Sequence, residues 1–291
     1  MSLQENVVVN RSAVHMALNS RSQRMLAIPR YTYNRLRGRM NGNDKALPNR
    51  LIVTCMDRRL VEKLKEYDNS DTVIISNAGA NVSGLRNTIA RLLQKNSFAE
   101  IRILTHDDCG AMRLVSEHLF EMRRAAPNIY VHLVRQFENR AHEAVELDHV
   151  NEIVQKERME EMARGTRVYS EMVKLHTLKI PAEMMKQKEA TYRLIVSKPV
   201  YGGYKSFFNS VSGEKKYSTY ALLGYGQDVI NDIEIAVSRL GVIEIFFLIQ
   251  DACERRVMEK YRDLIKTSIH RSEIALGFEI RTSIVENFQN L

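Results

Sequence analysis

The sequence predicts an α/β protein in which a mainly parallel sheet is flanked by helices. Short apolar runs alternate with helical patterns along the chain, as is typical of parallel sheets. The same succession of segments occurs twice in the 291 residues. We therefore predict two similar domains, residues 1–145 and residues 146–291, packed against each other as a pseudo-dimer.

Four apolar runs in the first half are predicted to be strands, because each is short and bounded by polar or turn-forming residues. A buried parallel strand carries apolar residues on both faces, which explains runs without strict alternation. The four runs are Leu51–Cys55, Thr72–Ile75, Ile101–Leu104 and Ile129–Val134.

Helices are predicted where apolar residues recur every three or four positions, or where a charged stretch lacks Gly and Pro. The long charged stretch between the two halves lacks both until Gly165, and helical character is expected to continue towards Pro181. The predicted helices are Ala13–Leu26, Gly84–Lys95, Gly110–Arg124, Phe137–Thr166 and Tyr169–Leu178.

Two matches in nearly one register indicate that the second half is a copy of the first. Arg50–Cys55 aligns with Arg193–Lys198, and Glu100–Cys109 aligns with Glu244–Cys253. The two alignments differ by one residue in register, which a single insertion explains. Because α/β units resemble one another wherever they occur, independent similarity stays open as the alternative.

Composition limits the partners and the compartment. The chain has 43 Lys and Arg against 35 Asp and Glu, but the basic residues are scattered among acidic ones, which argues against a nucleic-acid partner. No stretch approaches the roughly 20 apolar residues that cross a bilayer, so no membrane partner is expected. Three cysteines and the absence of a secretory pattern at Met1–Asn10 favour a reducing, cytoplasmic location.

Candidate metal ligands follow two predicted strands of the first half. Cys55, Asp57 and Arg59 alternate at the end of the first strand, so they would point to one side of an extended chain. His106 and Cys109 follow the third strand, and the positive dipole end of the next helix favours a thiolate at Cys109. Because the carboxyl ends of parallel strands meet at one edge of a sheet, the two cysteines and the histidine are expected to converge.

Two thiolates and one imidazole suit Zn²⁺, and three protein ligands leave one tetrahedral position open, as in a catalytic zinc site. We predict one zinc ion per chain, with Asp57 either filling that position or standing beside it. Each motif alone is weak. A buried thiol beside a surface ion pair explains the first, and a hydrogen-bonded structural histidine explains the second.

The order of these motifs resembles that of the β-class carbonic anhydrases. C-x-D-x-R at Cys55–Arg59 is followed by an Asn-Ala-Gly segment at Asn77–Gly79 and by H-x-x-C-G at His106–Gly110. The resemblance implies that Cys55, His106 and Cys109 are the zinc ligands.

The resemblance also implies roles for the residues around the metal. Arg59 would hold Asp57 off the zinc, and both would act in catalysis. Gly79 and Gly110 would line the substrate pocket. For Gly79 an ordinary turn is an equal alternative, and Gly110 would also let the next helix start close to the metal. Asp107 and Asp108 are expected either to orient neighbouring side chains or to lie in a solvated turn.

The implied reaction is the reversible hydration of CO₂ to bicarbonate and a proton by zinc-bound hydroxide. Two thiolates cancel the formal charge of the metal, so we expect activity to rise above neutral pH. Alternatives stay open: a zinc-binding scaffold or binding protein without significant turnover, a hydrolase of another small linear molecule such as carbon disulfide, and a reactive-thiol enzyme.

The second copy lacks this ligand set, so we predict a degenerate domain without metal that acts as the structural partner of the first. It would satisfy within one chain the dimer that the resemblance implies, and further homo-oligomerisation stays open. The residues aligned with the four motif positions Cys55, Asp57, His106 and Cys109 are Lys198, Val200, Gln250 and Cys253.

Overall fold

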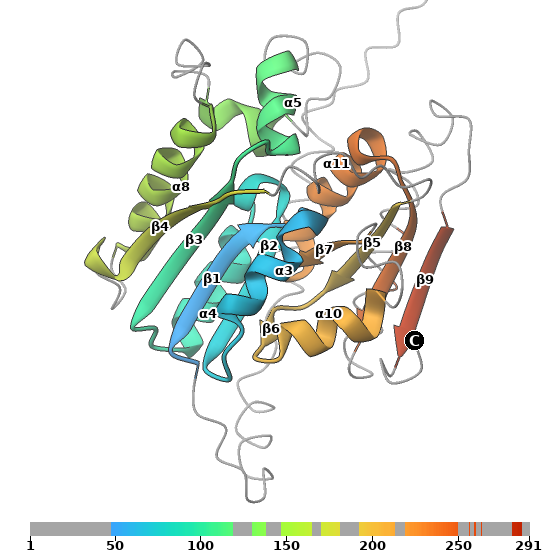
Figure 1. Ribbon diagram of the computed structural model, residues 1–291, viewed down its shortest axis with the longest axis horizontal. Coiled ribbons are helices and arrows are strands. Elements are labelled where there is room, and N and C mark those ends of the chain that lie inside the picture. The colour runs from blue at the N-terminus through green and yellow to red at the C-terminus, as the bar shows by residue number, and fades with distance from the viewer. Residues whose placement is uncertain are drawn as a thin grey trace, which may run out of the picture. The chain divides into compact units, whose positions relative to one another are not determined.

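One sheet of nine strands organises the part of the chain that the structure describes (Figure 1). The structure is a computed structural model, and all described residues belong to one compact unit, Ala46–Leu291. It describes residues 48–118, 130–137, 147–164, 170–180, 192–212, 219–249 and 281–286, together with Arg256, Glu259 and Asp263.

The strands follow the order β4-β3-β1-β2-β7-β5-β8-β9, and the short β6 pairs with β2. Pairing is parallel on both sides of the β2–β7 contact, while β2 runs antiparallel to β7 and to β6. The strands are β1 Arg50–Cys55, β2 Thr72–Asn77, β3 Glu100–His106, β4 Val173–Leu178, β5 Tyr192–Ser197, β6 Val200–Tyr201, β7 Thr219–Leu223, β8 Val242–Ile249 and β9 Arg281–Glu286.

The strand order is the same on both sides of the central contact. Read from the edge to the centre, the first group is β4-β3-β1-β2 and the second is β9-β8-β5-β7. In each group the outermost strand comes last in the chain and the central strand comes second. The groups meet where Ser76 of β2 pairs with Leu223 of β7.

Helices cover both faces of the sheet. Alternate side chains of a strand point to opposite faces, so each face presents apolar side chains that a helix can bury. Leu51 and Val53 of β1 pack in a cluster with apolar residues of α4 and α8, whereas Ile52 belongs to a second cluster with α3, α5, α10 and α11. Both clusters are buried, which explains the apolar run predicted for β1. The helices are α3 Val61–Leu64, α4 Arg86–Lys95, α5 Gly110–His118, α8 Leu147–Ala163, α10 Tyr204–Ser212 and α11 Ile230–Leu240.

Most predicted elements of the first half are confirmed where the structure describes them. The first three strands, the helix before β3 and the start of the helix at Gly110 lie where the sequence predicts them. The charged stretch contains α8, although it is described only in part. The predicted helix Ala13–Leu26 and the end of the helix expected to reach Arg124 lie outside the described residues.

Two predictions were wrong. Tyr130–Val134 is a π-helical turn rather than a strand, and its buried residues, Tyr130, Leu133 and Val134, follow helical spacing. The fourth strand of the first group is instead β4, within Tyr169–Leu178, where continued helix was predicted. Exposed polar residues at alternate positions of this edge strand gave it little apolar character. None of the described helices combines the length and apolar character needed to cross a membrane.

Candidate metal centre

Cys55, His106 and Cys109 meet at one edge of the sheet. Cys55 ends β1 and His106 ends β3, and these strands are parallel neighbours, so their carboxyl ends lie together. Asp108 adopts a left-handed backbone conformation with φ 51° in the turn that leads to α5. One potential ligand atom from each of the three buried residues lies within 4.8 Å of the other two.

The histidine ring leaves one nitrogen for a ligand. His106 Nδ1 lies 2.8 Å from the carbonyl oxygen of Asp107, so this nitrogen is the donor. Its other nitrogen, Nε2, is buried and has no hydrogen-bond partner among the described residues. An orphaned buried nitrogen beside two sulfurs is the donor set that a soft or borderline divalent cation requires.

The electrostatics of the cluster favour a positive charge. Burial opposes protonation of His106, but the neighbouring Cys55 and then Asp57 raise the pKa of its imidazole to about 9. Cys109 and burial raise the pKa of the Cys55 thiol. A bound divalent cation would satisfy both groups, because it stabilises thiolates and takes the lone pair of a neutral imidazole. The residues present therefore fit zinc.

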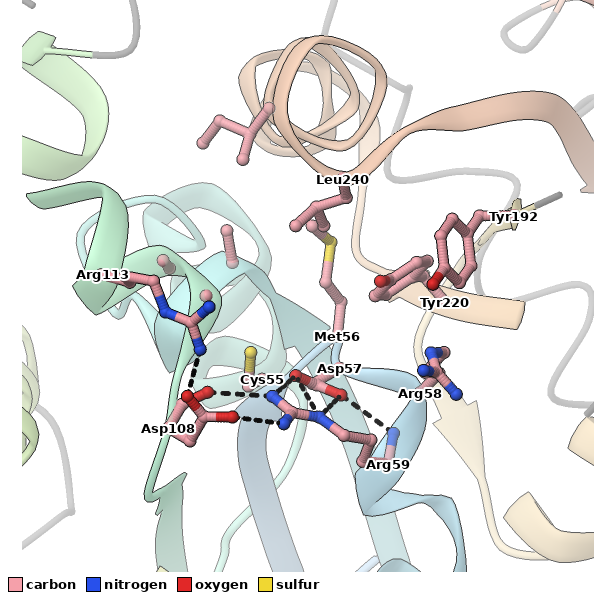
Figure 2. A pocket seen from close by; sticks show the side chains of 14 residues that line it. Cys55, Met56, Asp57, Arg58, Arg59, Asp108, Arg113, Tyr192, Tyr220 and Leu240 are labelled. Carbon is pink, nitrogen blue, oxygen red and sulfur yellow. Dashed lines mark hydrogen bonds and ion pairs between the residues drawn. The ribbon is translucent and has the colours of Figure 1, made fainter. Parts of the chain in front are cut away.

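Arg59 fixes the carboxylate of Asp57 beside the cluster. Its Nε and Nη2 atoms donate to Asp57 at 3.0 and 2.7 Å, and the backbone N–H of Arg59 donates to the same carboxylate at 2.9 Å. On its other side Arg59 donates to the side chain and the carbonyl of Asp108, at 2.7 and 2.9 Å, and Arg113 also pairs with Asp108 (Figure 2). Asp57 Oδ2 is 3.9 Å from His106 Nε2.

This network keeps Asp57 ionised. Burial raises the pKa of the Asp57 carboxyl, but the hydrogen bonds from Arg59, followed by the charges of His106 and Arg59, bring it below its ordinary value. The carboxylate is therefore a hydrogen-bond acceptor next to the cluster at every pH near neutrality.

A cavity of about 220 Å³ opens beside the cluster. Cys55, Asp57 and Arg59 form one side of it, and Figure 2 shows tyrosines and leucine from the second strand group on the other side. Burial, followed by the nearby Asp57, raises the pKa of Tyr220 to about 12, so its phenol stays protonated. Four lining residues come from β5, β7 and α11: Tyr192, Tyr220, Ile235 and Leu240.

The predicted glycines lie close to the cluster in different ways. Gly110 lines the cavity and begins α5. Gly79 has φ 74°, and its N–H donates to Cys55 Sγ at 3.3 Å. A Cβ at Gly79 would lie 3.0 Å from Met112 Cε and 3.2 Å from Ala111 Cβ. Gly79 thus combines the positive φ of a turn with a close approach to the metal centre.

The sequence predicted the roles of Asp107 and Asp108 only in general terms. Asp108 binds Arg59, as one alternative expected, whereas Asp107 Oδ1 accepts the backbone N–H of Ile180. The sequence did not identify Tyr192 and Tyr220 of the cavity, and no motif marks them. The aligned positions Lys198 and Val200 lie around the end of β5 in the second group, whereas Gln250 and Cys253 lie outside the described residues.

Residues from three other elements surround the turn after β2. The Gly79 carbonyl accepts from Asn151 of α8, and Asn81 Nδ2 donates to the His132 carbonyl at 2.8 Å. His132 Nε2 lies 3.1 Å from the fully buried carboxylate of Asp232. Burial lowers the pKa of His132, but Asp232 outweighs it and raises that pKa above its ordinary value.

The His132–Asp232 pair predicts a pH dependence of stability. A raised folded-state pKa means that its contribution is complete below the unfolded value of about 6.5 and is lost as pH rises through the folded value. The free energy of unfolding of the wild type, relative to His132→Asn, should therefore fall as the pH rises above about 6.5. Urea denaturation of both proteins at several pH values measures it, and a constant difference would show that folding does not shift the pKa of His132.

One known protein family matches about half of this chain. A family model described as carbonic anhydrase matches residues 50–200. This match covers half of the chain, and the chain belongs to the β-carbonic anhydrase family. No curated protein matches the sequence significantly.

Two solved structures are similar to this chain in fold. One is a β-carbonic anhydrase, isoform I, from the protozoan Trichomonas vaginalis, with 14% identity and a TM-score of 0.33; the match covers 60% of this chain and 94% of that one. The other is the β-carbonic anhydrase CcaA, with 19% identity and a TM-score of 0.38; the match covers 57% of this chain and 84% of that one.

Proposed function

We propose that this chain catalyses the reversible hydration of CO₂ to bicarbonate and a proton at a single zinc centre. The observation that carries the proposal is the convergence of Cys55, His106 and Cys109 within 4.8 Å, beside an Asp57–Arg59 pair that a purely structural metal site does not need. The family to which the chain belongs supports the same reaction.

Cys55 and Cys109 would hold zinc through sulfur, and His106 through Nε2. When bound, zinc supplies a Lewis acid that lowers the pKa of water towards neutrality. The backbone N–H of Gly79 would stabilise a Cys55 thiolate in the loaded site, and the Asp107 carbonyl orients the His106 ring. Such outer partners fix ligand geometry and tune ligand basicity.

Asp57 is the acceptor that orients the reacting oxygen. Its carboxylate is ionised, is fixed by three donors of Arg59, and lies on the cavity wall next to the ligands. Arg59 in turn is held by Asp108, so the guanidinium cannot swing away without breaking both sets of bonds. The pair therefore keeps Asp57 an acceptor beside the metal rather than a fourth ligand.

The cavity suits a small, mostly apolar substrate. Its volume of about 220 Å³ is several times the roughly 30 Å³ share of one water molecule, so CO₂ and solvent fit together. Met56, Ile235 and Leu240 give it an apolar side, while the charged pair lies opposite. CO₂ can thus approach from an apolar wall towards the charged residues.

We place the two halves of the chain in an internal pseudo-dimer, with residues 1–145 as the metal-binding copy and residues 146–291 as the copy without metal. The strand order is identical on either side of the β2–β7 contact, which supports duplication. β4 comes from residues 146–291 but pairs with β3 of the first group. The lining residues Tyr192, Tyr220, Ile235 and Leu240 give this copy a role at the site. Lys198 and Gln250, which align with the ligands Cys55 and His106, support loss of its own metal.

A stopped-flow CO₂ hydration assay with a pH-indicator dye tests the proposal. Zinc-loaded protein should accelerate the reaction, and more strongly at about pH 8.5 than at pH 7, because two thiolates weaken the Lewis acid. Protein stripped with a chelator is the control. A trace equal to the uncatalysed rate with zinc fully bound would contradict the proposal and favour a zinc-binding scaffold.

A further inference from the structure

Asp232 of α11 lies across the central contact from the metal ligands and is fully buried. Its Oδ1 accepts the backbone N–H of Ala78 at 2.9 Å, and its Oδ2 faces His132 Nε2. Ala78 precedes Gly79, whose own N–H donates to Cys55 Sγ. A side chain of α11, the helix between β7 and β8 in the chain, thus binds the peptide segment that directly contacts a metal ligand.

The segment that Asp232 holds is conformationally demanding. Gly79 has φ 74° and Ala80 has φ 55°, so two successive residues occupy the left-handed region. For alanine this conformation is unfavourable, and it persists only where neighbouring contacts enforce it. Asp232 binds the N–H at the start of the segment, and Asn151 binds the Gly79 carbonyl.

A comparable hydrogen bond follows β7, the strand of the second group that pairs with β2. The backbone N–H of Tyr225, two residues after β7, donates to Thr88 Oγ1 of α4 at 2.8 Å. Ala78 follows β2 and bonds to α11, whereas Tyr225 follows β7 and bonds to α4. After β7 the acceptor is the neutral hydroxyl of Thr88. After β2, whose group carries the ligands Cys55 and His106, the acceptor is the buried carboxylate of Asp232.

We propose that Asp232 is a positioning residue of the metal centre, which fixes the Ala78–Ala80 segment so that the Gly79 N–H points at the Cys55 sulfur. The second copy would then contribute to the ligand geometry of the first as well as to the cavity wall. The inference rests on the Cys–His–Cys metal centre of the proposed function and does not require CO₂ turnover.

A second buried carboxylate provides a matched control. Asp228 comes from the same copy, and it also accepts a first-group backbone N–H, that of Thr88 at 2.6 Å, and the side chain of Asn87. Its partners lie at the start of α4 rather than in the turn beside Cys55. Loss of Asp228 should therefore destabilise the contact between the groups without altering the metal ligands.

The test compares Asp232→Ala, Asp232→Asn and Asp228→Ala in full-length protein. Asp232→Ala should weaken zinc affinity about 10-fold in competition with a chromophoric chelator. It should also shift the thiolate-to-cobalt charge-transfer band of the Co²⁺-substituted protein. Asp232→Asn keeps an oxygen for the Ala78 N–H and should fall between the wild type and Asp232→Ala. Asp228→Ala should lower the melting temperature but leave affinity and spectrum unchanged.

Equal spectra and affinities in the Asp232 and Asp228 variants, or no change in either, would overturn the inference. If Asp232→Ala does not fold, the pair Asp232→Asn and Asp228→Asn decides, because only the former should shift the cobalt band. A wild type that binds zinc and cobalt but does not hydrate CO₂ would remove the proposed function and leave this test intact. A wild type that binds neither metal would overturn both.

Discussion

Replacing Cys109 with Ser is expected to remove zinc and CO₂ hydration together. The change keeps the size of a buried side chain but replaces a thiolate with a neutral hydroxyl, which is a poor zinc ligand at neutral pH. Loss of a residue that only hydrogen-bonds to a ligand can lower metal affinity by roughly 100-fold, and loss of the ligand itself should lower zinc affinity further. Metal analysis of purified protein should change from about one zinc per chain to nearly none.

Cys253→Ser is the matched control for this prediction. It makes the same chemical change at the aligned position of the proposed second copy, in which Lys198 and Gln250 align with two of the three ligands. This variant should keep about one zinc per chain and full activity. Two zinc ions in the wild type, or loss of zinc in Cys253→Ser, would show that the second copy holds metal. Retention of zinc and activity in Cys109→Ser would remove the proposed metal centre.

The ligand cluster could be predicted from sequence because strand ends fix it. Cys55 and His106 each follow a run that is buried on both faces, and parallel pairing then brings the two ends together. The hydrogen-bond partners around them could not be predicted in the same way. Asn151 and Asp232 reach the turn after β2 from distant elements, and a buried Asn or Asp in a helix has no local pattern that distinguishes it from a surface residue.

The errors in the fold have a related cause. β4 is an edge strand whose alternate residues, such as Lys174 and His176, face outwards, so its pairing with β3 rather than its own composition makes it a strand. Tyr130–Val134 shows the reverse, because five residues of mostly apolar character fit either a strand or a helical turn. Local periodicity decides an element only where the run is long or is buried on both faces.

Arg59→Lys is expected to keep zinc but lower kcat/KM on the order of 100-fold, the cost of a misplaced catalytic group. Lysine carries the same charge but cannot donate to Asp57 and Asp108 at once through a planar fork. Asp57 would lose its orientation, while Cys55, His106 and Cys109 make no direct bond to the guanidinium. Stopped-flow assays with parallel metal analysis measure both quantities.

Arg113→Lys controls for a general effect on the charges of the cavity. Arg113 also pairs with Asp108, but its side chain is 55% exposed and makes no bond to Asp57, so the change should have little effect on activity. Wild-type activity in Arg59→Lys would show that Asp57 does not depend on Arg59. Loss of zinc would show instead that Arg59 maintains the fold around the ligands.

A double variant, Arg59→Lys with Asp57→Ala, distinguishes two possible effects of Arg59→Lys. The Asp57 carboxylate either loses its orientation only, or also competes for the metal. In Arg59→Lys the freed carboxylate starts 3.9 Å from His106 Nε2 and is close enough to reach a cation held there. Small anions such as azide should then bind the Co²⁺-substituted Arg59→Lys protein more weakly than the wild type. Adding Asp57→Ala should restore anion binding but not CO₂ hydration, because the competing carboxylate and the required acceptor are the same group. Unchanged anion binding in Arg59→Lys would mean that Asp57 loses its orientation without approaching the metal.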